Sequence, residues 1–354
     1  MRIHFITLTA GLLALAGSVQ GASYTFTKIA ESSGGYTNMT SPSVNASGTV
    51  AFGATFAGGG HLFTSSGGIP TPVYDQTVIT PSINASGQIG FISQGNVYRF
   101  TSGTPANLGS LPTLYATTIS DSGNVYFTAN SGLIPDKFLV SDGVNITPVD
   151  HALGLIPRQS FRPAVSSNDH TAISFPSSGI SRDSVGISAT YTDPTIPPPF
   201  PNTEPFTAFG EADINASKTL VFQAFWGAIT HNFYRDDNGV VTQIATGNGI
   251  PAINDQNIVA ALFTDGTKKL KAGVGAPTDT VLSVGDAFMG STVTDLQFTH
   301  EGLSDGNQLA FTASLADGRT GIYVTSVPEP ALAGLIIPAL YLLKRRRNSS
   351  KSTL

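Results

Sequence analysis

The 354-residue chain contains no cysteine. This absence excludes disulfide bonds, thiolate nucleophiles and cysteine-ligated metals. A fold built from this sequence must therefore be held together by packing and strand pairing.

Charged residues are also scarce, at 12% of the chain. Six basic residues and Glu329 lie in the two end segments discussed below, so residues 23–326 carry 12 basic and 22 acidic side chains, a net charge of −10. An acidic surface disfavours polyanionic partners, and we expect no nucleic-acid binding. Neutral polysaccharide and divalent cations are compatible with this charge.

Recognisable catalytic motifs are missing as well. The sequence has no GxSxG elbow, no P-loop and no HExxH metal motif, and its six histidines are scattered. His300-Glu301 could transfer a proton, but an adjacent pair of this kind is weak evidence for a site. We therefore expect no catalytic residues, no metal site and no cofactor, although a paired-carboxylate glycosidase site stays open because residues distant in the sequence can meet at one place in the fold.

Two Asp-containing segments could be calcium loops or hairpin turns. Asp236-Asp237-Asn238-Gly239 and Ser141-Asp142-Gly143 have suitable oxygen ligands. Asp-Gly and Asn-Gly pairs also favour tight turns between strands, and we prefer that interpretation.

The N-terminus has the order of a secretory signal peptide. Arg2 precedes an apolar run, Phe5–Ala16, and small residues follow up to Ala22. We predict a signal peptide over 1–22, removed by signal peptidase; the alternative is a buried N-terminal helix.

The C-terminus combines three features in order. Val327-Pro328-Glu329-Pro330 precedes thirteen uncharged residues, Ala331–Leu343, and the basic cluster Lys344, Arg345, Arg346 and Arg347. A full membrane span needs about 20 apolar residues, so this segment with its internal proline, Pro338, predicts a short and poor permanent anchor. The basic residues would hold it at the cytoplasmic face.

These three features resemble the PEP-CTERM sorting signal. The resemblance covers about the last 28 residues and implies processing by an exosortase in a Gram-negative bacterium that makes exopolysaccharide. It places 327–354 in a sorting segment with a short transmembrane helix. The protein would be anchored transiently in the inner membrane and then reach the cell surface or the extracellular space; a plain tail anchor is the alternative.

Between the ends, 38 glycines, 22 prolines and many β-branched residues predict a β-rich fold with frequent turns. A motif, clearest as Pro42–Phe52 and Pro81–Phe91, recurs seven times. Its first position is occupied in turn by Asn45, Asn84, Ser120, Ser166, Asn215, Asn254 and Ser304. The spacing averages about 43 residues, the period of four-stranded propeller blades.

The motif has the chemistry of a turn that enters a strand. Asn or Ser at the first position can cap a turn through its side-chain oxygen, and glycine at the fourth position supplies a positive φ. Asn replaces or neighbours that glycine in three copies, whereas Lys218 departs from the pattern and predicts a different turn in the fifth copy. We assign a structural turn role to Asn45, Gly48, Asn84, Gly87, Asp121, Gly123, Asn215, Asn254 and Asp305.

The last repeat lacks its final strand, because the sorting segment follows Val324 almost at once. The segment Tyr24–Ile29 lies before the first motif, where such a strand should be. We therefore predict an all-β fold over 23–326, a seven-bladed propeller whose N-terminal strand closes the last blade. Six or eight blades, or two β-domains divided at Pro194–Pro205, are the alternatives; we interpret that proline-rich stretch as an insertion.

The repeats also resemble a family of exported bacterial proteins with tandem NxxGxxxF repeats and interchangeable C-terminal anchors. That resemblance carries no catalytic residues. We expect a non-enzymatic surface or matrix protein that binds extracellular polysaccharide or other surface proteins, linked to exopolysaccharide or biofilm. The alternative is a glycan-binding or glycan-cleaving propeller, which requires Asp, Glu, His and aromatic side chains at one channel mouth.

Overall fold

A computed structural model describes residues 23–130, 137–149, 162–175, 179–183, 185–188, 206, 208–226 and 230–328. Outside these ranges lie the predicted signal peptide, the proline-rich stretch, Glu329, Pro330, the apolar segment and the basic cluster. The predictions for these segments therefore stay predictions. Within the described ranges no helix combines the length and apolarity needed to span a bilayer.

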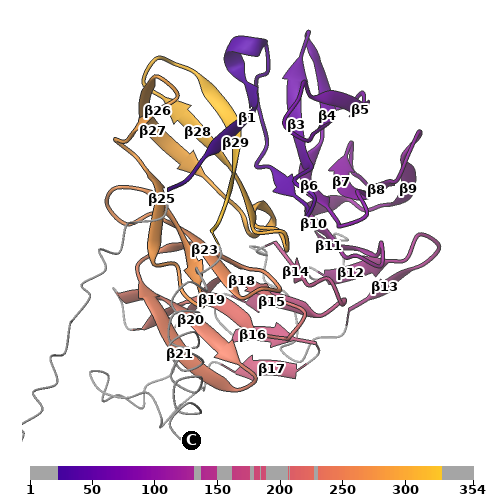
Figure 1. Cartoon of the computed structure of the whole chain (residues 1–354). Coiled ribbons are helices and arrows are strands. Elements are labelled where there is room, and N and C mark those ends of the chain that lie inside the picture. The colour runs from indigo at the N-terminus through magenta and orange to yellow at the C-terminus, as the bar shows by residue number, and fades with distance from the viewer. Residues whose placement is uncertain are drawn as a thin grey trace, which may run out of the picture.

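Seven antiparallel sheets follow one another around a common centre (Figure 1). Blade 1 consists of β2 (Ser43–Val44), β3 (Val50–Phe56), β4 (Gly59–Ser65) and β5 (Thr71–Tyr74). Blade 2 consists of β6 (Ile79–Ile83), β7 (Ile89–Ser93), β8 (Asn96–Phe100) and β9 (Ala106–Ser110). Blade 3 consists of β10 (Thr113–Ile119), β11 (Val125–Asn130), β12 (Lys137–Ser141) and β13 (Ile146–Pro148). The prediction of an all-β, seven-bladed propeller is confirmed.

Blade 4 consists of β14 (Ala164–Val165), β15 (Thr171–Phe175), β16 (Gly179–Arg182) and β17 (Val185–Ser188). Blade 5 consists of β18 (Ala208–Ile214), β19 (Leu220–Trp226), β20 (Thr230–Asp237) and β21 (Val240–Thr246). Blade 6 consists of β22 (Gly249–Ile253), β23 (Ile258–Phe263), β24 (Lys269–Val274) and β25 (Asp279–Ser283). Blade 7 contains β26 (Ala287–Phe288), β27 (Ser291–Gln297), β28 (Gln308–Leu315), β29 (Thr320–Ser326) and β1 (Phe26–Glu31). Two short 3₁₀ helices, η1 (Ser32–Gly34) and η2 (His300–Gly302), complete the described elements.

The N-terminal strand closes the ring as the sequence predicts. β1 pairs antiparallel with β29, with Phe26 opposite Thr325 (Figure 1). Buried Glu31 at the end of β1 accepts hydrogen bonds from Arg319 Nη1 and Tyr323 Oη, both at 2.9 Å, and from Ser33 Oγ at 2.6 Å. A charge with this many donors fixes the position of β1 on the sheet.

In five of the seven blades the last residue of the motif is a phenylalanine at the core of the blade. Phe52, Phe91, Phe127, Phe222 and Phe311 are fully buried at this position. The second strand places these rings opposite apolar residues of the third strand; Phe52 stacks on Phe63 with 5.4 Å between ring centroids, and Phe91 on Tyr98 with 5.3 Å. Such cross-strand pairs are a main source of sheet stability.

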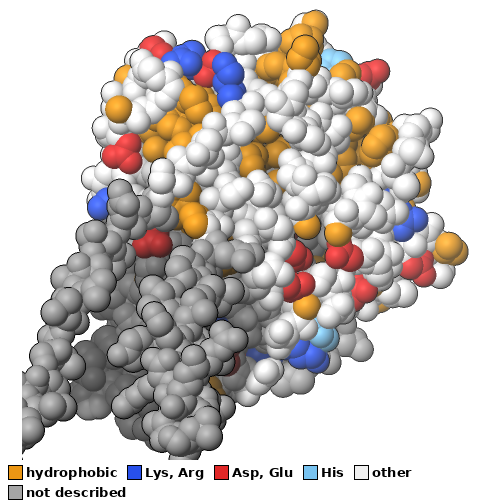
Figure 2. Space-filling view, viewed as in Figure 1, with side chains coloured by type: hydrophobic (Ala, Val, Ile, Leu, Met, Phe, Trp, Pro, Cys, Tyr) orange, Lys and Arg blue, Asp and Glu red, His pale blue; other side chains and the backbone are white. Residues whose placement is uncertain are grey.

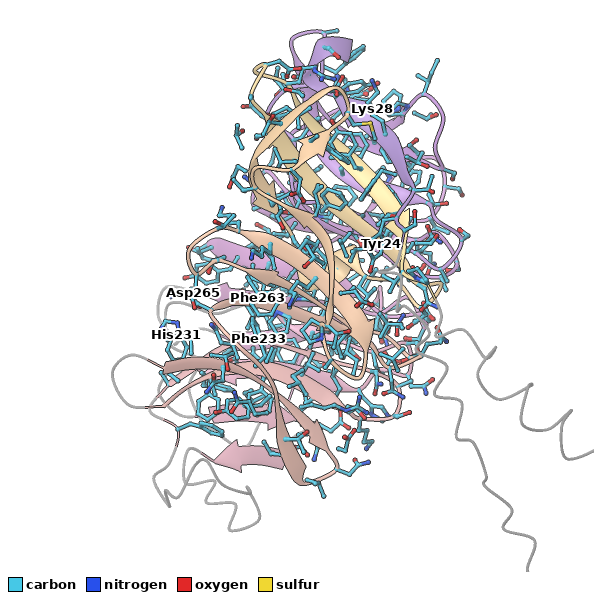
Figure 3. All side chains as sticks on the ribbon, turned by 60° about the vertical axis from the view of Figure 1, so that its left-hand side comes forward. Tyr24, Lys28, His231, Phe233, Phe263 and Asp265 are labelled. Atoms are coloured by element: carbon cyan, nitrogen blue, oxygen red, sulfur yellow. The ribbon has the colours of Figure 1, made fainter. Side chains whose placement is uncertain are left out.

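Aromatic contacts also join neighbouring blades. Figure 3 shows Phe233 of β20 beside Phe263 of β23, and their rings meet edge to face at 5.0 Å. The blades are therefore held together by apolar packing between sheets as well as by strand closure.

Candidate functional site

The seven motif turns lie together on one face of the ring, which we call the turn face. Each turn joins the first strand of a blade, which lies nearest the axis, to the second. In every copy the fourth residue donates its N–H to the carbonyl of the first, as Gly48 does to Asn45 at 2.9 Å. The fourth residue has a positive φ throughout, at Gly48, Gly87, Gly123, Asp169, Lys218, Asn257 and Asn307.

The expectation of a different turn in the fifth copy is wrong. Lys218 has φ 64° and donates its N–H to Asn215 O at 2.9 Å, as glycine does in the other copies. A lysine in this conformation costs about 1 kcal/mol relative to glycine. Its ammonium lies 3.0 Å from Asp183 of blade 4, so this side chain connects two blades.

The motif asparagines bond within their own turn and to the next blade. Asn254 Oδ1 accepts the N–H of Ile258 at 2.9 Å, and its Nδ2 donates to Ser304 O at 2.9 Å. Asn45, Asn84 and Asn215 repeat this pair of bonds. These amides therefore join successive turns around the ring. The sequence predicted only the bonds of each side-chain oxygen within its own turn.

A second set of polar residues stands two positions before the first turn residue of the motif in four of the seven copies. Ser43 Oγ accepts the N–H of Ile83 in the next blade at 3.0 Å, and Ser82 Oγ accepts that of Ile119 at 3.0 Å. Asp213 does the same for Ile253 at 2.8 Å. These side chains bond the inner strands of neighbouring blades together below the turns.

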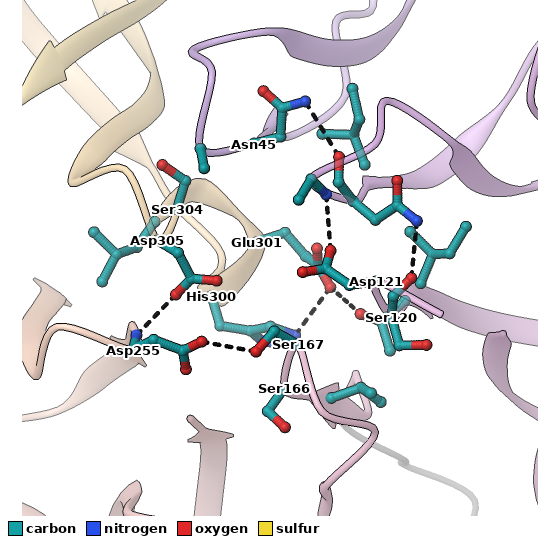
Figure 4. A pocket seen from close by; sticks show the side chains of 18 of the residues that line it. Asn45, Ser120, Asp121, Ser166, Ser167, Asp255, His300, Glu301, Ser304 and Asp305 are labelled. Atoms are coloured by element: carbon teal, nitrogen blue, oxygen red, sulfur yellow. Dashed lines mark hydrogen bonds and ion pairs between the residues drawn. The ribbon is translucent and has the colours of Figure 1, made fainter. Parts of the chain in front are cut away.

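Glu301 lies at the centre of this arrangement (Figure 4). It belongs to η2 of blade 7 and accepts hydrogen bonds from residues of three other blades: Ser82 Oγ at 2.7 Å, Ser43 Oγ at 3.4 Å and the hydroxyl of Thr118. His300 Nε2 lies 3.5 Å from Glu301 Oε1, the oxygen that also accepts a hydrogen bond from the hydroxyl of Thr118. One carboxylate thus connects blades 1, 2, 3 and 7.

The charges near Glu301 determine its protonation. Burial raises its pKa, but the interaction with His300 and the charge of Arg162 outweigh burial and lower the pKa to about 2. Burial lowers the pKa of His300, and here the interaction with Glu301 and the charge of Asp213 reverse the direction and raise it. Arg162 donates to Thr117 O at 2.9 Å and Pro81 O at 3.0 Å.

Two further carboxyls of β18 face these charges. Burial raises the pKa of Glu211 to about 7, although the charges of His300 and Arg162 oppose the shift. Burial likewise raises the pKa of Asp213 to about 6, against the charge of His300 and two backbone N–H donors. Near neutral pH the carboxyls of Glu211 and Asp213 are therefore close to their titration points.

Above Glu301 an axial pocket of about 100 Å³ opens on the turn face. Its polar lining includes Asp121, Asp255, Asp305, Ser167, His300 and Glu301 (Figure 4). Asp121 Oδ1 accepts the N–H of Ala85, and Asp305 Oδ1 that of Asp255, each at 2.8 Å. Burial and the charges of Asp255 and Asp121 raise the pKa of Asp305 to about 6.

The predicted turn residues are thus brought together around the axis, and four of them also line the pocket: Asn45, Asn84, Asp121 and Asp305. Val327 of the predicted sorting motif is buried against blade 7 and donates its N–H to Asn307 O at 2.8 Å, whereas Pro328 follows it at the surface. The two Asp-containing segments form hairpin turns; Asp142 Oδ1 accepts the N–H groups of Val144 and Asn145. Among the described residues no three His, Asp or Glu side chains are arranged to hold a metal ion.

Sequence reasoning missed the central role of Glu301, whose partners Ser43, Ser82 and Thr118 are distant in the chain. A signal was present, because the residue two positions before the motif is polar in four copies: Ser43, Ser82, Thr118 and Asp213.

No family model matches the chain, and no curated protein matches it. Among solved structures, the chain is similar to a puromycin-hydrolyzing peptidase of Mycobacterium tuberculosis, with 15% identity and a TM-score of 0.53 over 81% of this chain and 51% of that one. A prolyl endopeptidase aligns at 11% identity with a TM-score of 0.47 over 84% of this chain and 51% of that one. The chain spans about half the length of these proteins, and the first likeness shows the propeller fold alone.

Proposed function

We propose that this protein is an exported surface or matrix protein whose propeller is a non-enzymatic binding scaffold. Export through the signal peptide 1–22 and exosortase processing of 327–354 would deliver it to the cell surface or the extracellular space. The association of such tails with exopolysaccharide production suggests polysaccharide or another surface protein as its partner. The closed ring supports this proposal, because a rigid domain without cysteine suits both the cell surface and the extracellular space.

The observation that carries the proposal is the set of contacts that Glu301 makes within the propeller. Both oxygens of this carboxylate contact residues of the protein itself, in blades 1, 2, 3 and 7. Asp121 and Asp305 likewise bond the backbone of neighbouring blades. These are the contacts of groups that hold a ring together, and they support a structural role for the polar centre.

The test is fractionation of native cells. We expect a tail-trimmed protein at the surface or in the medium of wild-type cells, and an untrimmed, membrane-bound form in cells that lack the exosortase. Replacement of Pro328, Glu329 and Pro330 by alanine should have the same effect as loss of the exosortase. The control is Ser350→Ala, outside the motif. Trimmed protein in exosortase-deficient cells would refute the processing step.

A glycan-binding or glycan-cleaving propeller is the second candidate. In its favour, Asp, Glu and His side chains do gather at one channel mouth. Against it, the described residues that line the pocket include no Phe, Tyr or Trp, and about 100 Å³ is small beside the 300–1,000 Å³ of typical ligand sites. Sugar release from polysaccharides by purified 23–328, lost in Asp305→Asn while the fold is retained, would favour this candidate.

A further inference from the structure

The chain enters and leaves the propeller at the turn face. β1 begins at Phe26, opposite Thr325 near the end of β29. Val327 then donates its N–H to Asn307 O, within the motif turn of blade 7. Whatever follows Pro328 therefore starts from the turn face, and only three residues separate Val327 from the start of the apolar segment at Ala331. The four steps from Val327 to Ala331 span at most about 14 Å.

The same face carries the most exposed large hydrophobic side chains of the described ranges. Ile69 is 91% exposed, Val144 89%, Val240 59% and Val274 51%. They stand in or beside the turns between the third and fourth strands of blades 1, 3, 5 and 6. These turns lie on the turn face because strands alternate in direction; in blade 1, Ser66 Oγ is 3.0 Å from Thr49 Oγ1 of the motif turn.

The acidic groups of the axial pocket lie apart from these four side chains, whereas Asp142 and Asp237 stand in the same turns as Val144 and Val240. Asp121, Asp255 and Asp305 surround the axial pocket and bond to backbone N–H groups of neighbouring blades. Figure 2 shows apolar side chains both at the edge of the surface in view and within it, with acidic side chains among them. The four aliphatic tips can contact an apolar surface while the carboxylates of the axial pocket remain in its recess.

We propose that the turn face lies against a lipid bilayer, with Ile69, Val144, Val240 and Val274 at the lipid–water interface. The proposal rests on the membrane anchoring included in the proposed function. Insertion of Ala331–Leu343 would bring this face, and not the opposite one, within roughly 14 Å of the bilayer surface. The occupant is lipid because the chain's own uncharged segment follows this face directly, and exposed aliphatic groups enter the interfacial region readily. The central carboxylates favour zwitterionic over anionic lipid.

Single-cysteine labelling can test this orientation, because the chain has no cysteine of its own. Ile69→Cys and Val144→Cys place a fluorophore on the turn face. Thr267→Cys is the matched control, since Thr267 is exposed between β23 and β24 on the opposite face. Each full-length protein is reconstituted into phosphatidylcholine vesicles that contain lipid with a nitroxide on the headgroup. We expect several-fold stronger quenching at positions 69 and 144 than at 267.

Flotation of the same vesicles separates the two levels of the proposal. Protein that floats with the vesicles but shows equal quenching on both faces, or stronger quenching at position 267, would overturn the orientation and leave the anchoring intact. Protein that does not float would overturn the anchoring and, with it, the orientation. A chain that ends at Pro328 should lose both flotation and the difference in quenching. If that shortened chain keeps both, the apolar segment is not the cause and the proposal is wrong.

Discussion

Replacement of Glu301 by glutamine should destabilise the propeller substantially. A pKa lowered from 4.5 to about 2 corresponds to about 3 kcal/mol of favourable interaction with the ionised carboxylate. Glu301→Gln keeps the shape of the side chain but leaves His300 and Arg162 without their shared counter-charge, a change that typically costs 3–5 kcal/mol in buried pairs. For a domain of about 300 residues, a loss of about 3 kcal/mol lowers Tm by about 5 °C.

The assay is urea unfolding at pH 7 together with thermal melts, both followed by circular dichroism. Asp75→Asn is the matched control; its carboxylate is 85% exposed and 3.0 Å from His61 Nδ1, and we expect a change below about 0.5 kcal/mol. The difference between wild type and Glu301→Gln should be complete above pH 4.5 and shrink as the pH falls toward 2, because the stabilising group has the lower pKa in the folded state. A variant with a Tm within about 1 °C of wild type at pH 7 would refute the reasoning.

Three further predictions concern the channel and the turns. The pKa of Glu211 is raised to about 7, so between pH 4.5 and 7 the folded protein holds a proton that the unfolded chain has lost, and the free energy of unfolding should fall over this range. Glu211→Gln should remove this pH dependence. In urea unfolding at pH 8 the variant should be more stable than wild type by up to about 3 kcal/mol. Asn254→Ala removes bonds to Ile258 N–H and Ser304 O and should cost about 2–4 kcal/mol, whereas Asn254→Asp, which keeps the acceptor, should differ measurably from it in the same assay. Gly87→Ala, with open space around its new Cβ, should lose about 1 kcal/mol from the positive φ alone, and Lys218→Gly should be neutral or gain stability; equal losses in thermal melts would contradict this account of the turn.

The repeat period and the turn chemistry were sufficient to predict the architecture. Each motif turn is a local structure, and local structures leave a local signal in the sequence. The closure by β1 also followed from counting strands, because the last repeat lacked one. The Lys218 prediction failed because a preference for glycine at positive φ is a matter of about 1 kcal/mol, which the rest of a packed blade can outweigh.

The polar centre was less accessible to sequence reasoning. His300 and Glu301 are adjacent in the chain, and nothing nearby indicates that they reach the axis. The hydroxyls that donate hydrogen bonds to Glu301 belong to Ser82 and Thr118, which are 219 and 183 residues away in the chain. The bond from each motif asparagine to the next blade is hidden for the same reason: the local turn explains the asparagine oxygen, whereas the partner of its amide depends on how the blades are placed.

The closed ring is the central claim, because both the chain exit and the turn face depend on it. The most direct measurement compares the thermal unfolding of 23–328 with that of a chain lacking residues 23–31, with and without an added peptide of sequence 23–31. Without β1, the shortened chain loses its pairing with β29 and the contacts of Glu31 with Arg319 and Tyr323. We predict a large loss of Tm that the peptide restores in a concentration-dependent manner. A shortened chain as stable as 23–328, unaffected by the peptide, would contradict the account.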